Sequence, residues 1–196
     1  MLAAALALAL VSPPHGLVDA SRLVPDALLD VRYATADNFV GKRLYPEARC
    51  LLKRPVAERL ARAAARLRRE GLRLRIHDCY RPLSVQREMW AAFPHEGYVA
   101  NPAQGSNHNR GAAVDVGLAT LAKGPVEMPT RYDAFDRRAH AGATEGVSPA
   151  ARRNRDLLRR AMEAEGFRVN RMEWWHFDAP ERKGAPLLDV PFSAVP

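Results

Sequence analysis

The chain has 196 residues, of which 47% are hydrophobic and 27% are charged. This length and composition are typical of one globular domain and exclude a disordered chain. No run of about 18 apolar residues occurs, so we expect no membrane span. The formal net charge is +8, but the arginines are scattered instead of forming a basic tail with interleaved aromatics. We therefore expect no nucleic-acid partner.

Residues 1–11 form an apolar run at the N-terminus. The run is long enough for the hydrophobic region of a secretory signal, but no basic residue precedes it. A Ser-Pro-Pro sequence from Ser12 then breaks any helix, as expected where a signal joins a mature domain. We assign residues 1–20 to an incomplete signal segment and 21–196 to the domain. This assignment favours a periplasmic or secreted protein; if the run is instead an N-terminal helix, the protein is cytoplasmic.

The first predicted helix of the domain covers residues 55–70, where apolar residues recur at helical spacing. Residues 72–78 alternate strictly between apolar and polar, which predicts a strand with one face on the core. A second helix is expected over residues 84–93. The segment 94–106, rich in Pro, Asn, Gln and Gly, then predicts a loop.

The second half of the chain adds a predicted strand of small residues over 111–118. Ser148 and Pro149 mark the beginning of a third helix, which stops at Gly166. Residues 171–177 are dense in aromatics and predict a final strand. Because helices and strands are mixed without a regular βαβ alternation, we expect a single α+β domain. In this domain an antiparallel sheet carries helices packed on one side.

Two cysteines, Cys50 and Cys79, occur in the sequence. An even number of cysteines in an exported protein permits a disulfide, whereas two buried free thiols are the alternative. We predict the disulfide, which would tie the segment around Cys50 to the end of the strand 72–78. In the chain-entropy model, closing a loop of about 30 residues stabilises a protein by roughly 3 to 4 kcal/mol.

Residues able to carry chemistry gather in two segments that are far apart in sequence. His108 lies seven residues before Asp115, whose small apolar neighbours would make a buried carboxylate costly without a cation or donors. His176 lies three residues after Glu173. Two histidines and one carboxylate make a three-ligand zinc site with an open fourth position, and the remaining glutamate is then a candidate general base. Taken singly, each segment is also compatible with hydrogen-bonded structural residues.

The first segment reads S-x-H-x-x-G-x-A-x-D from Ser106 to Asp115, and the second reads E-W-W-H from Glu173 to His176. Together they resemble the motifs of the D-alanyl-D-alanine dipeptidases of zinc peptidase family M15. Three further segments resemble motifs of that family in the same order: 30–41, 78–82 and 131–140. The resemblance covers nearly the whole predicted domain.

The resemblance implies that His108, Asp115 and His176 hold one zinc ion per chain and that Glu173 is the catalytic base. It also implies that Arg81 faces the scissile carbonyl. A fixed guanidinium at this place would stabilise the oxyanion that appears during amide hydrolysis.

The resemblance further implies a substrate-binding role for Ser106 and Asp133, which would hold the free ammonium of a dipeptide. Asp136 is an alternative to Asp133, and either aspartate could instead cap a turn. Tyr33 would line the pocket wall, with a core tyrosine as the alternative. Where the family has Arg-Ser-His, this sequence reads Arg-Ala-His, and we expect its His140 to be structural.

The spacing within the second motif raises a geometric difficulty. Residues three apart on a regular strand point to opposite faces of the sheet, so Glu173 and His176 could not both face one metal ion. We therefore predict that the backbone is bulged here or that Glu173 precedes the regular strand.

These observations favour zinc-dependent hydrolysis of D-alanyl-D-alanine, a small D,D-dipeptide, in peptidoglycan turnover or D-alanine recovery. No obligate protein partner is expected. The alternative is a D,D-carboxypeptidase or peptidoglycan endopeptidase of the same superfamily, which would need an open groove instead of a pocket closed by an acidic residue. A third hypothesis is a non-catalytic zinc-binding domain that recognises cell-wall peptides. Glu173 argues against it, because a binding module needs no base.

Overall fold

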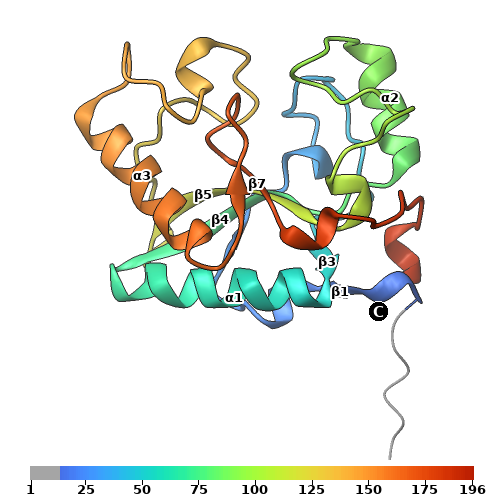
Figure 1. Ribbon diagram of the computed structural model, residues 1–196, viewed down its shortest axis with the longest axis horizontal. Coiled ribbons are helices and arrows are strands. Elements are labelled where there is room, and N and C mark those ends of the chain that lie inside the picture. The colour runs from blue at the N-terminus through green and yellow to red at the C-terminus, as the bar shows by residue number, and fades with distance from the viewer. Residues whose placement is uncertain (1–13) are drawn as a thin grey trace, which may run out of the picture.

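The computed structural model describes residues 14–196 (Figure 1). Five strands form one sheet in the order β2–β4–β5–β7–β6, and β1 and β3 form a separate two-stranded sheet. The strands are β1 (Leu17–Asp19), β2 (Leu28–Leu29), β3 (Leu51–Lys53), β4 (Leu72–Asp78), β5 (Ala113–Thr120), β6 (Arg168–Val169) and β7 (His176–Asp178). The α-helices are α1 (Arg54–Arg69), α2 (Leu83–Ala92) and α3 (Pro149–Glu163).

The N-terminal part of the described chain belongs to the domain. The apolar run 1–11, expected to be a signal, lies outside the described residues. Residues 17–20, which we assigned to the signal segment, are part of the fold because β1 pairs with β3 and Leu17 and Ala20 are fully buried. The boundary expected at residue 21 therefore falls too late in the chain.

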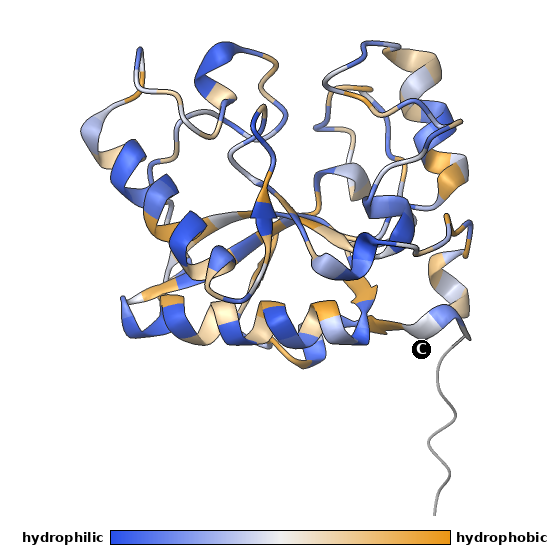
Figure 2. Ribbon diagram, in the orientation of Figure 1, coloured by the Kyte–Doolittle hydropathy of each residue, from blue (hydrophilic) through white to orange (hydrophobic). Residues whose placement is uncertain are grey.

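Helices α1 and α3 pack against each other and against the five-stranded sheet, as expected for helices on one side. Helix α1 buries Val56, Leu60 and Leu67 and turns arginines outward, and Figure 2 shows the resulting alternation of hydrophobic and hydrophilic residues. Helix α3 begins at the predicted cap, where the Ser148 hydroxyl accepts a hydrogen bond from the Ala151 amide. Helix α2 lies apart from them, at the upper right of Figure 1.

The five-stranded sheet is antiparallel except at one edge. Strands β4, β5, β7 and β6 pair antiparallel, as predicted, but β2 pairs in parallel with β4. The connection between β2 and β4 contains α1, and a crossover through a helix is what parallel neighbours require. The α+β class is confirmed. The parallel edge was not predicted, because a strand of two residues is too short to show a sequence pattern.

The final strand differs from the prediction for residues 171–177. Strand β7 begins only at His176, and Trp174 and Trp175 form a turn before it. Both tryptophans are almost fully buried in the core that α1 and α3 share with the sheet. Aromatic residues indicated a strand here, but tertiary burial and not strand pairing accounts for them.

The predicted disulfide is present between Cys50 and Cys79, whose Cα atoms are 5.1 Å apart. It joins the residue before β3 to the residue after β4, and both cysteines are buried. In the described residues no helix is long and apolar enough to cross a membrane.

Candidate active site

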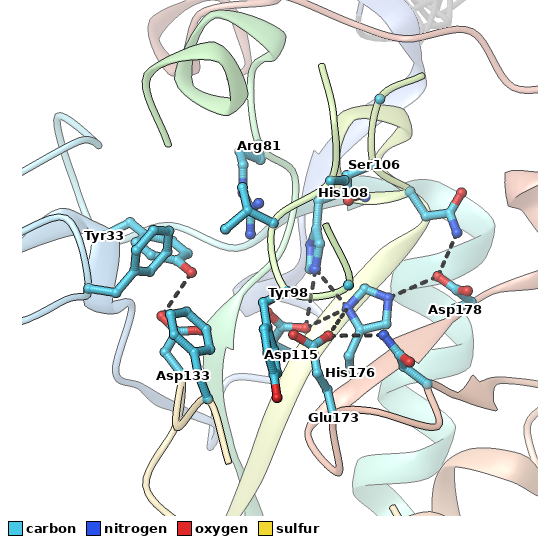
Figure 3. Close-up of a pocket in the computed structure, with 18 residues that line it drawn as sticks. Tyr33, Arg81, Tyr98, Ser106, His108, Asp115, Asp133, Glu173, His176 and Asp178 are labelled. Atoms are coloured by element: carbon cyan, nitrogen blue, oxygen red, sulfur yellow. Dashed lines mark hydrogen bonds and ion pairs between the residues drawn. The ribbon is translucent and has the colours of Figure 1, made fainter. Parts of the chain in front are cut away.

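A pocket of about 350 Å³ opens above the middle of the sheet (Figure 3). It receives side chains from β5, from the start of β7 and from the loops around them. All eight residues predicted for the metal, the chemistry and the substrate line it: Tyr33, Arg81, Ser106, His108, Asp115, Asp133, Glu173 and His176. The structure thus brings together residues that the sequence separates by more than 140 positions.

Three possible ligand atoms meet at one point of this pocket. The Nε2 atom of His108 lies 3.1 Å from Asp115 Oδ1 and 3.1 Å from His176 Nδ1, and the latter two atoms are 3.0 Å apart. All three residues are buried. Two imidazole nitrogens and one carboxylate oxygen are a donor set that zinc accepts, with room for a fourth ligand on the pocket side. The residues therefore fit a metal centre.

The local backbone explains the spacing of the first motif. His108 begins a short 3₁₀ helix, His108–Arg110, which ends at Gly111 with a φ of 63°. A Cβ atom at Gly111 would lie 2.6 Å from the side chain of Leu17, so the site needs a glycine for both its backbone and its space. The chain then enters β5, where Asp115 is the direct antiparallel partner of His176.

Each histidine is oriented by an acceptor on its far nitrogen. His108 Nδ1 lies 2.6 Å from the carbonyl oxygen of Cys79, which can only accept, so the proton is on Nδ1 and Nε2 is free for a metal. His176 Nε2 lies 3.0 Å from Asp178 Oδ1, which leaves Nδ1 free in the same way. Asn107 donates to the same Asp178 oxygen at 2.8 Å. Such outer contacts fix the ring orientation of metal ligands.

Glu173 lies just before β7, as predicted from the spacing. The amide of His176 donates to the Glu173 carbonyl at 3.3 Å, and this turn brings both side chains to the same pocket. The carboxyl Oε2 of Glu173 accepts a hydrogen bond from Asn170 and lies 3.8 Å from His176 Nδ1. Burial raises the pKa of Glu173 to about 7, so this carboxyl can both take up and release a proton near neutral pH.

Arg81 occupies the opposite side of the pocket in a fixed position. Its Nε and Nη2 atoms donate to Asp78 Oδ2 at 3.1 and 2.6 Å, and its Nη1 atom donates to Gln86 at 2.8 Å. Asp78 is itself held by the hydroxyl of Tyr45 at 2.8 Å. The guanidinium is buried and cannot swing away without leaving these partners.

Comparison with known proteins agrees with this geometry. A family model described as D-ala-D-ala dipeptidase, of peptidase family M15, matches residues 14–196. The chain belongs to peptidase family M15. Among similar proteins named D-alanyl-D-alanine dipeptidase, that of Escherichia coli K12 is 40% identical over 177 residues, covering 90% of this chain and 91% of the relative. That of Enterococcus faecalis V583 is 35% identical over 187 residues, covering 83% and 87%.

As a member of the M15 family, the chain is a metallopeptidase, and its His-Asp-His group is the set of described residues suited to the metal. Of the residues expected to bind substrate, Ser106 lies beside His108, whose amide donates to the Ser106 hydroxyl at 3.2 Å, whereas Tyr33 and Asp133 lie together elsewhere on the pocket wall (Figure 3). Tyr33 donates to Asp133 Oδ2 at 2.9 Å, and burial, with the Asp115 charge nearby, raises the pKa of Asp133 well above its usual value.

Asp133 and Asp136, the two candidates for the same role, lie in different places. Asp133 lines the pocket of this M15 peptidase, with a φ of 57° that is uncommon outside glycine. Asp136 instead accepts a hydrogen bond from the Arg138 amide and caps the 3₁₀ helix Arg137–Ala139. Tyr33 serves both expected purposes, since it is buried in the core and also lines the pocket.

Several residues of the site were missed in the sequence. These are the partners that hold the chemical groups in place: Asp78, Gln86, Asn107, Tyr132, Asn170 and Asp178. Only Asp178 had a usable signal, because it lies two residues after His176 and therefore on the same face of β7. Asp78, Gln86 and Asn170 lie within five positions of their partners but share no regular helix or strand with them, and Asn107 and Tyr132 contact theirs through the tertiary fold.

Proposed function

We propose that this M15 peptidase hydrolyses D-alanyl-D-alanine to two D-alanines, with one zinc ion held by His108, Asp115 and His176. The observation that carries the proposal is the convergence of three ligand atoms, a carboxyl with a pKa of about 7 and a buried guanidinium on one small pocket. Relatives bearing the name of this activity, similar over most of the chain, support the choice of substrate.

The chain supplies a base and an oxyanion partner for this reaction. A bound zinc ion lowers the pKa of water and polarises the scissile carbonyl. Glu173 accepts a proton from the attacking water and passes it to the leaving amine. Arg81 faces the charge that develops on the carbonyl oxygen, and because Asp78 and Gln86 already hold it, no reorganisation is needed as that charge appears.

The amino end of the dipeptide is held by Ser106 and Asp133. A substrate ammonium beside Asp133 would compensate a carboxylate that burial disfavours, which makes this carboxyl selective for a cation. Tyr33 holds the same carboxylate in place. An acidic group that closes the pocket favours a free dipeptide over the peptide stem that a D,D-carboxypeptidase or endopeptidase would take.

We further propose that the reaction takes place in the periplasm or outside the cell. The Cys50–Cys79 disulfide supports this location, because such bonds persist in oxidising compartments. Peptidoglycan turnover or recovery of D-alanine from the cell envelope would supply the dipeptide there.

A parallel assay tests the proposal. Purified, zinc-loaded protein is given D-alanyl-D-alanine, L-alanyl-L-alanine and a pentapeptide stem, and released amino acids are measured. We expect cleavage of the D,D-dipeptide and little of the other two. Preferential cleavage of the pentapeptide would overturn the dipeptidase assignment, and a fully zinc-loaded protein inactive on all three would favour the non-catalytic recognition domain.

A further inference from the structure

A second pocket, of about 620 Å³, is formed by α3, β6 and the segment 137–143. We call it the arginine pocket, because four arginines line it: Arg137, Arg159, Arg168 and Arg171. The acidic residue on its wall is Glu163, which pairs with Arg159 at 2.8 Å. The remaining three guanidiniums therefore give the pocket a surplus of positive charge.

These three arginines lack acidic partners. Within residues 14–196, no ion pair involves Arg137, Arg168 or Arg171, although Arg159 and Arg138 close by are paired. On α1, Arg62 and Arg66 share Glu165 at 2.7 and 2.6 Å, whereas Arg54 and Arg69 of the same helix also have no ion pair among the described residues. Arg137, Arg168 and Arg171 are all exposed, so their charge is balanced by solvent ions or by a bound anion, and what sets them apart is that they gather around one pocket.

His140 adds a second, independent observation. It lines the same pocket, and its Nε2 atom is buried without a hydrogen-bond partner among the described residues. We expect His140 to be structural, and buried polar atoms nearly always have a hydrogen-bond partner, so this nitrogen can pair with a group from outside the described residues. The neighbouring residues Ala141, Gly142 and Ala143 have small side chains or none, so they leave the pocket open.

We propose that the arginine pocket binds a small phosphate-bearing molecule with two phosphoryl groups. Guanidinium groups donate in a planar fork that matches two oxygens of a phosphate, and such charge-assisted pairs are stronger than neutral hydrogen bonds. Three unpaired guanidiniums can engage more oxygens than a single phosphate offers, so a diphosphate suits the pocket better.

The arginine pocket is separate from the catalytic pocket, but one segment borders both. Val169 and Arg171 line the arginine pocket, whereas Asn170 lines the catalytic pocket and donates to Glu173 at 3.0 Å. Phosphate oxygens are also ligands for a metal ion, so a binding test has to distinguish the two pockets. Variants confined to the arginine pocket do this.

The test is calorimetric titration of the metal-loaded protein with pyrophosphate and, separately, with inorganic phosphate. We expect saturable pyrophosphate binding that is tighter than phosphate binding. Affinity should fall at least about tenfold in Arg168→Gln/Arg171→Gln, and also in Arg137→Gln, which checks the result if the double variant folds poorly. The matched control Arg54→Gln/Arg153→Gln removes the same charge from exposed positions outside the pocket and should bind within about twofold of wild type.

Three outcomes would overturn the proposal: no saturable binding to the wild-type protein, equal weakening in both double variants, or wild-type affinity in both pocket variants. The last would place pyrophosphate elsewhere, the metal centre included. Metal content is measured after each titration, because pyrophosphate can remove metal ions. Dipeptide hydrolysis by Arg168→Gln/Arg171→Gln should remain within a few-fold of wild type, so the proposed function and this site can fail independently.

Discussion

The two sides of the catalytic pocket differ in how their charges are compensated. On the Arg81 side, Asp78 and Gln86 accept hydrogen bonds from the guanidinium, so folding alone supplies partners for its charge. On the other side, His108, Asp115 and His176 turn their free ligand atoms toward one another, and the group is suited to a cation that the chain does not supply. We therefore expect substitutions among His108, Asp115 and His176 to alter the metal content, and substitutions at Arg81 to alter the rate alone.

The largest effect is expected from His176→Ala. Removing one of three protein ligands should abolish metal binding and dipeptide hydrolysis together. Metal content by mass spectrometry and the hydrolysis rate check this. The control is His95→Ala, which changes an exposed histidine outside the His-Asp-His group and should keep full metal content. If His176→Ala kept both metal and activity, His176 would not be a metal ligand.

Glu173→Ala separates the base from the ligands. Proton transfer is lost while the His-Asp-His group remains, so the rate should fall by about 10³- to 10⁴-fold with stoichiometric metal retained. The same two measurements apply. Loss of metal in this variant would mean that Glu173 is a metal ligand and not the base.

Arg81→Lys tests the side that folding completes. Lysine keeps the charge but has no planar fork, so kcat should fall by about 10²-fold or more while metal content is unchanged. Steady-state kinetics with metal analysis measures both quantities. A rate within a few-fold of wild type would show that the guanidinium makes no contact in the transition state.

Asp178→Asn changes a residue that contacts the His-Asp-His group from outside it. The carboxylate accepts a hydrogen bond from His176 Nε2, so its loss should weaken metal binding by about tenfold without abolishing it. Competition with a chelator gives the affinity. Asp136→Asn, which alters a cap outside the catalytic pocket, should leave that affinity unchanged.

The smallest effect on activity is expected from Cys50→Ser/Cys79→Ser. The bridge adjoins the site through Cys79, whose carbonyl accepts a hydrogen bond from His108. Its removal should lower the free energy of unfolding by roughly 3 kcal/mol, while the folded protein retains activity within a few-fold. Chemical denaturation gives the first quantity. Thiol titration of unfolded, unreduced protein from the periplasm should find no free thiol, and two per chain would contradict the bridge and the proposed location.

Local patterns made much of the fold predictable from the sequence. Strand β4 has the predicted bounds, 72–78, and apolar and polar residues alternate over 72–77 of it. Helices α1 and α2 lie within one residue of the predicted ranges. The strand predicted over 171–177 is wrong before His176. Trp174 and Trp175 have a high β propensity, but they lie in a turn and are buried in the core.

The candidate site, like the fold, was predictable from the sequence only in part. Its chemical groups were predictable because they lie in short motifs, and the position of Glu173 before β7 is one of the two arrangements predicted from the two-residue period of a strand. Among the residues that hold these groups, Asn107 and Tyr132 were not predictable because their partners are distant: Asn107 is 71 positions from Asp178, and Tyr132 is 17 from Asp115. Such pairs depend on the assembled fold, which no local pattern encodes.

The parallel edge strand β2 has a consequence for local unfolding. Its two residues pair with β4 across 47 positions of the chain, and the 3₁₀ helix that contains Tyr33 follows directly. Short edge pairs of high sequence separation contribute few contacts, so they open at a lower free energy than the central strands β4 and β5. Amide hydrogen exchange should therefore be faster in β2 than in β4, and the wall that carries Tyr33 loosens before the metal ligands on β5 and β7 separate.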